Sequence, residues 1–269
     1  MKLGIVSHNV AGWGWRTTGE SYEDRFERGL IDLKAKNCFL TNLQEAQLSG
    51  GKYIEVIRKH FPEAEYELIL PKAYKNQPKS IVSLMLVKKE YCDSYSVSTL
   101  EGLEDSLRYN FVTINTTIEG LCFRVLNVNV PHNTFDYSKT AEWYRQSRVE
   151  LRKLFLQRIK ELSETYRSEP DLKIVITSDM NMSYEDPYIQ KLAYSYDSPM
   201  LDAVKECDRT KITWNNRHLK GRNRIDYIMY SRAIISERGG LKAKYTVVDD
   251  TPITQKTSDH CYLVGGLVF

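Results

Sequence analysis

The chain has 269 residues, of which 42% are hydrophobic and 27% are charged, values typical of a globular protein with a substantial core. The net charge of +3 permits an anionic substrate without indicating one, because local patches of charge matter more than the sum. No internal repeat, low-complexity tract or linker rich in proline and glycine divides the sequence. We therefore expect one domain spanning residues 1–269 that acts as a monomer.

The sequence also excludes several cellular settings. No segment approaches the ~20 apolar residues of a membrane-spanning helix. The first ten residues include Ser7, His8 and Asn9, where a secretory signal needs apolar residues. The five cysteines are scattered and form no CxxC pair, which is typical of free thiols in a reducing compartment and excludes the common zinc sites. These features predict a soluble, cytoplasmic protein that does not act at a membrane.

Apolar runs alternate with helical patterns in the first half of the chain. Strands are predicted, in chain order, over Leu3–Val6, Cys38–Leu43, Tyr66–Leu70, Ser80–Val87, Tyr109–Ile118 and Leu121–Val130. Apolar residues at helical spacing predict helices over Glu20–Lys36 and Lys52–His60. The last two strands flank Glu119 and Gly120, and this spacing indicates a hairpin.

The second half begins with the longest predicted helix, Thr140–Arg167. Its apolar stripe indicates packing against a core and comprises Trp143, Leu151, Leu154, Phe155, Ile159 and Leu162. The β-branched run that follows Lys173 predicts a buried strand ending near Asp179. Short helices are predicted over Pro187–Ala193 and Pro199–Lys205, and strands over Lys211–Trp214, Arg224–Tyr230, Tyr245–Val248 and Cys261–Phe269.

This order of elements favours two packed sheets with helices on the outside. A doubly wound parallel sheet is the alternative that the pattern leaves open. The hairpin and the run of strands near the C-terminus favour the first arrangement, because parallel neighbours need a long crossover connection between them.

Polar side chains stand where several of these strands end. They are Asn9, Glu45, Asn129 with His132, Asp179 with Asn181, and Asp259 with His260. The ends of central strands are where α/β proteins keep their chemistry. Taken singly, each of these residues is explained equally well by a turn, a helix cap or a surface ion pair. Their recurrence at successive strand ends favours a shared functional site.

Six short motifs at these positions carry a family resemblance. They are SHNVAGW, LQEA, NVNVPHN, TSDMN, TW followed by RIDYI, and SDH, and they run from residue 7 to residue 260. In this order they resemble the endonuclease/exonuclease/phosphatase superfamily, the group of deoxyribonuclease I and the abasic-site endonucleases. The resemblance implies an α+β fold of the deoxyribonuclease I kind, a four-layered α/β sandwich. Two packed, mostly antiparallel β-sheets are flanked by helices in such a fold.

The resemblance also implies hydrolysis of phosphoester bonds with a divalent cation, usually Mg²⁺, with Mn²⁺ as the alternative. Glu45 matches the family's metal-binding carboxylate, with Asn9 beside it as a ligand or as an orienting amide. Asp259 is expected near the same metal ion. Oxygen ligands of this kind suit a hard cation, in agreement with the resemblance.

The catalytic roles are carried over in the same way. Asp179 matches the acid that positions and deprotonates the attacking water, and Asn181 matches the amide that holds that water or a phosphate oxygen. His260 matches the histidine that contacts the scissile phosphate, where charge accumulates in the transition state. Asp226 is expected to pair with His260 and to keep its imidazole oriented and protonated.

The sequence departs from the family pattern in three places. Asn129 occupies the position of a tyrosine or histidine that assists at the phosphate or leaving group, so that either His132 or the Asn129 amide takes over the role. Ser178 replaces a glycine. Ala11 stands where abasic-site endonucleases carry an additional acid, which disfavours their specific activity.

Several residues are candidates for substrate contacts. Trp214 is expected to wall the cleft and to stack on a base or sugar. Lys220, Arg222 and Arg224 form a basic segment that either contacts nucleic acid or is an ordinary solvated loop.

These features predict a metal-dependent phosphodiesterase acting on nucleic acid, DNA before RNA. A phosphatase or phosphodiesterase on an inositol phosphate, sphingomyelin or a similar small substrate is the alternative. A catalytically inactive binding scaffold is disfavoured because the carboxylates, the amide and the histidine occur together.

Overall fold

The computed structural model describes residues 2–11, 20–78, 80–118, 121–132, 142–169, 172–202, 204, 211–216, 221–235, 242–254 and 257–268. The strands of one sheet are β1 (Lys2–Asn9), β2 (Leu40–Gln47), β3 (Tyr66–Ile69), β4 (Ile81–Lys88), β13 (Lys242–Asp249) and β14 (Tyr262–Val268). The strands of the other are β5 (Cys92–Ser98), β6 (Tyr109–Thr116), β7 (Cys122–Asn129), β8 (Lys173–Asp179), β9 (Met200–Asp202) and β12 (Asp226–Ser231). A separate hairpin joins β10 (Trp214–Asn216) to β11 (Gly221–Asn223).

The helices lie outside the sheets. They are α1 (Tyr22–Ala35), α2 (Lys52–His60), α3 (Glu142–Ser168), α4 (Pro187–Ile189), α5 (Arg232–Ile235) and α6 (Thr251–Thr254). Single turns lie over Ser49–Gly51, Lys72–Asn76, Lys89–Tyr91 and Gln190–Tyr194. In the described chain, no helix is both long and apolar enough to cross a membrane.

Among the described residues, each sheet has six strands and is mostly antiparallel. The strand orders are β13-β14-β1-β2-β4-β3 and β5-β6-β7-β8-β12-β9. Only β1 with β2 and β7 with β8 run parallel among the described pairs, and the latter are connected through α3. The predicted hairpin is the antiparallel pair of β6 and β7.

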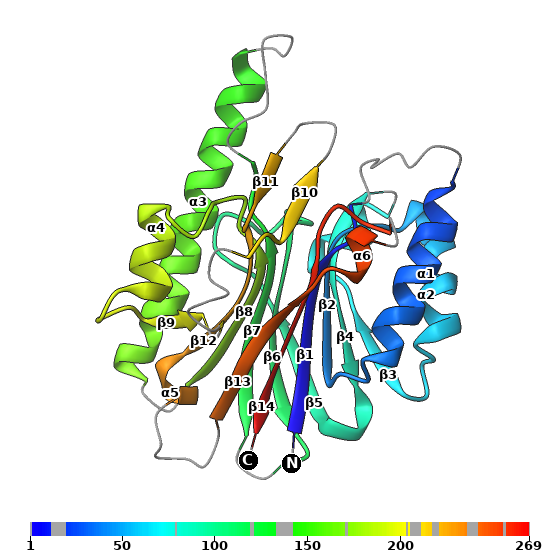
Figure 1. Ribbon diagram of the computed structural model, residues 1–269, viewed down its shortest axis with the longest axis horizontal. Coiled ribbons are helices and arrows are strands. Elements are labelled where there is room, and N and C mark those ends of the chain that lie inside the picture. Colours follow the sequence, from blue (N-terminus) through cyan, green and yellow to red (C-terminus); the bar gives the residue numbers. More distant parts are fainter. Residues whose placement is uncertain are drawn as a thin grey trace.

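Three apolar cores separate four layers. The middle core lies between the sheets, where Ile5 and Val87 of one sheet meet Val125 and Val175 of the other. In the second core, α3 packs Phe155 and other apolar residues against the outer face of the sheet that contains β7 and β8. The third core lies under α1 and α2. Figure 1 shows this order, with α1 and α2 on one side of the sheets and α3 and α4 on the other. The predicted four-layered sandwich is confirmed.

The strand directions bring the polar motifs to one edge of the sandwich. The strands β1, β2, β7 and β8 end at this edge, while β12 and β14 begin there (Figure 1). Both parallel pairs and their antiparallel neighbours therefore deliver polar residues from distant parts of the sequence to one place.

One predicted helix is wrong, one strand was missed and one strand is shifted along the chain. Met200–Asp202 is not helical but forms β9, an edge strand paired with Met229–Ser231 of β12. Pairing with β12 and burial of Met200 override the local helical pattern. The strand β5 was not predicted because most of its side chains are exposed, so its sequence lacks an apolar face. β10 also begins at Trp214, later than the predicted strand. The four described cysteines, Cys38, Cys92, Cys122 and Cys261, form no disulfide with one another.

Candidate active site

Asp179 is the centre of the polar cluster. It is the last residue of β8, where it pairs in register with Asn129 of β7 on one side and with Asp226 of β12 on the other. Its Oδ2 accepts hydrogen bonds from Asn9 Nδ2 at 2.9 Å and from Asn129 Nδ2 at 3.1 Å. Its Oδ1 accepts from the backbone N–H of Asn181 at 3.0 Å. Strand β1 of one sheet, strand β7 of the other and the backbone that follows β8 thus fix a single buried carboxylate.

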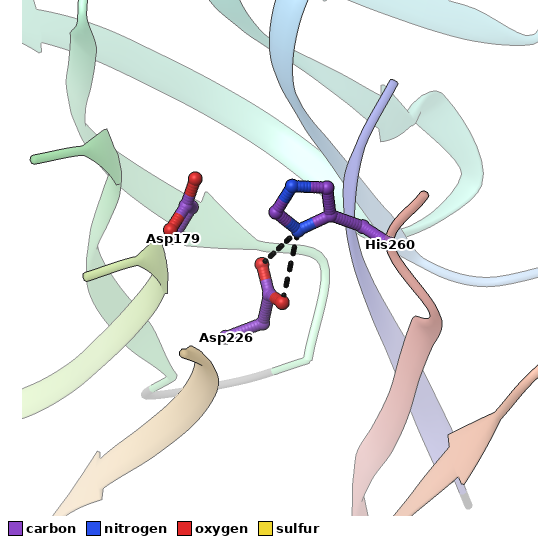
Figure 2. A group of neighbouring side chains, drawn as sticks. All are labelled: Asp179, Asp226 and His260. Atoms are coloured by element: carbon purple, nitrogen blue, oxygen red, sulfur yellow. Dashed lines mark hydrogen bonds and ion pairs between the residues drawn. The ribbon is translucent and has the colours of Figure 1, made fainter. Parts of the chain in front are cut away.

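Asp226 and His260 form a hydrogen-bonded pair beside Asp179. The Nδ1 atom of His260 lies 3.1 Å from both carboxylate oxygens of Asp226 (Figure 2). Both side chains are buried, and Asp179 faces the same pair from the neighbouring strand. Thr213 Oγ1 accepts the backbone N–H groups of Ile225 and Asp226 at 3.0 and 3.1 Å, which holds the start of β12 in place.

The combined effect of burial and neighbouring charges raises the pKa values of both His260 and Asp179 above their ordinary values. Burial alone would lower the pKa of His260, but the adjacent Asp226 carboxylate outweighs it and raises the pKa to about 10. The imidazole is therefore protonated at neutral pH. Burial and the Asp226 carboxylate raise the pKa of Asp179 to about 7, with a smaller contribution from Glu45. An acid with such a pKa can accept a proton near neutral pH.

A β-bulge presents Glu45 to this cluster. The pairing of β2 with β4 shifts register between Leu43 and Ala46, and Glu45 adopts a left-handed backbone with φ of 55°. Bulges often lie next to active sites, where they redirect a side chain. A non-glycine residue in this region is strained, and such strain is usual at functional sites. The sequence predicted the residue but not the bulge.

Asn129 connects Glu45 to Asp179. Its Nδ2 donates to Glu45 Oε1 at 3.2 Å as well as to Asp179, and its Oδ1 accepts a hydrogen bond from the guanidinium of Arg108. The Arg108 contact determines which end of the amide faces the two carboxylates. Arg108 was not among the predicted site residues, because it lies in a polar turn with no motif around it.

The amide of Asn9 is similarly held from both ends. Besides the bond to Asp179, its Oδ1 accepts the backbone N–H of Ala11 at 2.8 Å. Ala11 itself has a φ of 49° and is buried. Asn9 therefore orients Asp179, while the second lone pair of its Oδ1 is still able to reach a cation.

Asp259 and Trp214 lie on the other side of His260. Trp214 Nε1 donates to Asp259 Oδ2 at 3.1 Å, and Asp259 Oδ1 lies 3.9 Å from His260 Nε2. The indole is half-buried, so one of its functions is to hold Asp259.

Arg152 of α3 joins the ends of β7 and β8. Its guanidinium donates to the carbonyl of Pro131 and, at 3.4 Å, to that of Asn181. Asn181 in turn donates from Nδ2 to the Val130 carbonyl at 2.8 Å and has a φ of 50°. His132, the next residue after Pro131, is half-buried, and burial and the charge of Arg152 lower its pKa.

The substrate-contact prediction for Arg224 is wrong. Its side chain is 1% exposed and forms a buried ion pair with Asp202 of β9. Tyr194 OH also accepts from the guanidinium, at 3.2 Å. Arg224 therefore stabilises the edge of the sheet. Lys220 lies outside the described residues, and Arg222 is placed only by its backbone in β11.

The donor set fits a hard divalent cation. Glu45 and Asp179 share one amide, and the nearby Asp226 charge is matched by the protonated His260. Within the described part of the chain, one group of carboxylates and histidines meets metal-ligand spacing, namely Asp179, Asp226 and His260. The His260 Nδ1 atom of this group faces both Asp226 oxygens, whereas Glu45 contributes a further carboxylate on the Asn129 side of Asp179. The oxygen ligands there suit Mg²⁺ or Mn²⁺.

Comparisons with known proteins give matches by structure. No protein-family model matches the sequence, and a search of curated proteins finds no match. The endonuclease/exonuclease/phosphatase from Bacteroides vulgatus is similar with a TM-score of 0.70 at 14% identity, over 100% of this chain and 99% of that chain. D. rerio TDP2 complexed with a single-strand DNA product gives 0.66 at 13% identity, over 100% and 99%. The human Nocturnin catalytic domain with bound sulfate anion gives 0.67 at 15% identity, over 100% and 94%. At such identities the likeness establishes the fold.

Proposed function

Because the chain has the fold of the endonuclease/exonuclease/phosphatase superfamily, we propose that it is a divalent-cation-dependent phosphodiesterase of nucleic acid, with DNA preferred to RNA. The observation that carries this proposal is the buried Asp179, held by two amides beside the Asp226–His260 pair. A base poised near neutral pH next to a fixed cationic donor is what hydrolysis of a phosphodiester needs.

In this proposal Asp179 is the general base. It takes a proton from the attacking water as the water oxygen bonds to phosphorus, and the bond from phosphorus to the leaving oxygen breaks. The leaving oxygen takes a proton from solvent. The amide of Asn181, held against the end of β7, positions the water or a phosphate oxygen. Protonated His260 donates to a phosphate oxygen, where negative charge grows in the transition state.

Glu45 would hold the cation, together with the free lone pair of Asn9 Oδ1 and with Asp259 nearby. When bound, a divalent cation of this kind neutralises charge on the phosphate and supports the leaving oxygen. The roles of the protein groups follow from their contacts. Asn129 holds Glu45 and Asp179 apart at a fixed separation, and Arg108 fixes Asn129.

The preference for nucleic acid draws on two features. The D. rerio TDP2 structure of the same fold contains a single-strand DNA product. In this chain, the half-buried Arg108 lines the cleft beside the acidic centre and would meet a phosphate of a polyanion. Lys220, which precedes β11 in the sequence, and Arg222 of β11 are expected to add contacts, and Trp214 is expected to stack on a base or sugar.

The experiment is a substrate panel on the purified protein. After EDTA treatment, Mg²⁺ or Mn²⁺ is added back and the protein is tested on single-stranded DNA, duplex DNA, abasic duplex, RNA and phosphoinositides. We expect cation-dependent cleavage of the nucleic acids, DNA fastest. Asp179→Asn should be inactive, and Asp93→Asn, which changes an exposed carboxylate on β5, should match the wild type. Cleavage of phosphoinositides alone, or activity unaffected by EDTA, would refute the proposal.

A further inference from the structure

Arg152 is a buried charge on α3, the helix that covers the outer face of the sheet containing β7 and β8 (Figure 1). It is 8% exposed, and a charge so deeply buried needs partners that satisfy it. Its guanidinium donates to the Pro131 carbonyl just after β7 and, at 3.4 Å, to the Asn181 carbonyl just after β8. One side chain therefore joins the two segments that follow the strands ending in Asn129 and Asp179.

The backbone of Asn181 is left-handed and is held from three sides. Its φ of 50° lies in a region that few non-glycine residues adopt. Its backbone N–H donates to Asp179 Oδ1 at 3.0 Å, and its side-chain Nδ2 donates to the Val130 carbonyl at 2.8 Å. The bond from Arg152 to its carbonyl is the third contact. A conformation of this kind persists where the surrounding contacts impose it, so the loss of one contact should let the amide move.

The neighbouring backbone has partners of its own. The Met182 carbonyl accepts Tyr227 OH at 2.9 Å. Further along the chain, Tyr188 OH donates to the Leu156 carbonyl of α3 at 2.6 Å. Removing Arg152 would therefore take the partner from the Asn181 carbonyl while the rest of the segment stays attached to α3 and β12.

A guanidinium suits this place better than an ammonium group. It carries five N–H donors in a planar arrangement, so it can bind carbonyls from two segments at once. Burial lowers the pKa of Arg152, and the nearby carboxylates of Asp186 and Asp179 oppose that shift. An arginine keeps its proton in such surroundings, and all of its donors with it.

We infer that Arg152 is a positioning residue for the hydrolysis, which holds the Asn181 amide in place by fixing the segments that leave β7 and β8. This role rests on the proposed phosphodiesterase function and deepens it. Because the bonds of Arg152 go to backbone carbonyls, it acts through Asn181 and not by contact with the reacting phosphate. Its loss should slow the chemical step more than it weakens substrate binding.

The test measures kcat and KM for bis(p-nitrophenyl) phosphate and for a single-stranded DNA oligonucleotide. Arg152→Met keeps the aliphatic stem but removes both donors, so kcat should fall about 10- to 150-fold with KM unchanged, the range for a hydrogen bond from a charged group. Arg152→Lys keeps the charge but reaches one carbonyl at a time, so its loss should be smaller. Adding Arg152→Met to Asn181→Ala should slow the reaction no more than about twofold further.

Two controls on α3 separate positioning from stability. Arg158→Met removes an arginine that pairs with surface carboxylates and should leave kcat unchanged. Phe155→Leu removes buried apolar contacts beneath the helix, so it should lower the urea midpoint without lowering kcat. All variants are assayed at a temperature where circular dichroism shows them folded. If Arg152→Met does not fold, Arg152→Lys takes its place in the double variant.

The outcomes distinguish the two levels of the argument. Wild-type kcat in Arg152→Met, losses that multiply in the double variant, or an equal loss of kcat in Phe155→Leu would each overturn the positioning role while the phosphodiesterase stands. If the wild type cleaves neither diester, the proposed function is wrong and the role of Arg152 fails with it.

Discussion

Replacing Asp226 by asparagine should convert His260 from a permanent cation into a group that loses its proton within the working pH range. Asp226 is the charge that outweighs burial and raises the pKa of His260 to about 10. Without it, burial remains, and the pKa should fall to the reference value of ~6.5 or below. While its pKa is raised, His260 stays protonated up to high pH. When Asp226 is removed and this pKa falls, His260 loses its proton at lower pH, so the alkaline limb of the pH–rate profile should move to lower pH.

The size of the effect follows from the protonated fraction. A histidine with a pKa of ~6.5 is about half protonated at pH 6.5 and about 3% protonated at pH 8. Asp226→Asn should thus lower kcat by about twofold at pH 6.5 and by about 30-fold at pH 8 or more, since burial lowers the pKa further. Removing the donor altogether in His260→Ala should cost about 10²- to 10³-fold.

The assay combines kinetics with NMR titration. We would measure kcat from pH 5.5 to 9 at saturating cation, and titrate the ring signals of His260, assigned by comparison with His260→Ala. Asp93→Asn is the control for loss of a carboxylate. Because Asp226 acts through His260, the double variant should be scarcely slower than His260→Ala. Additive losses, or an Asp226→Asn protein in which His260 still titrates above pH 8, would refute this account.

Three other perturbations test separate contacts. Glu45→Gln keeps the shape but removes the charge, so Mg²⁺ affinity by calorimetry should fall ~100-fold or more; equal affinity would place the cation elsewhere. Arg108→Met removes the donor to the buried Asn129 Oδ1, so it should lower kcat about tenfold or more and lower stability in urea unfolding by about 1–3 kcal/mol; an unchanged kcat would contradict the role of Arg108. Arg224→Met leaves Asp202 as an unpaired buried charge and should cost about 3–5 kcal/mol in urea unfolding, largely recovered by adding Asp202→Leu. A loss below about 1 kcal/mol would show that the pair is not structural.

The sequence predicted the positions of those polar residues that directly adjoin an apolar, strand-like run. Asn9, Asp179 and His260 each adjoin an apolar run, so their positions at strand ends could be read directly, and the family motifs assigned their partners. The parallel and antiparallel pairings then bring these ends together, as two packed sheets require. The convergence of these residues at one edge was thus predictable, because each residue's place depends on the strand that carries it.

Features that depend on distant contacts were not predictable. Arg224 stands in a basic segment and looks like a substrate contact, but its partner Asp202 is on an edge strand whose own pattern suggests a helix. Arg108 gains its role only from Asn129, 21 residues later. Neither contact produces a recognisable sequence pattern, because a single long-range hydrogen bond does not constrain the residue types of its neighbours in the sequence.

The bulge at Glu45 also bears on how the protein folds. Asn127 of β7 reaches from the opposite sheet, and its Nδ2 donates to the carbonyls of Leu43 and Leu84 at 3.0 and 2.9 Å, beside the register shift. These bonds join residues 84 and 43 positions apart, so they form only after the sheets have docked. Pairing of β2 with β4 can come earlier, but the strained conformation that presents Glu45 is completed by the other sheet. We therefore expect the cluster around Asp179 to form only after both sheets have docked, because Asn9 of one sheet and Asn129 of the other both bind its carboxylate.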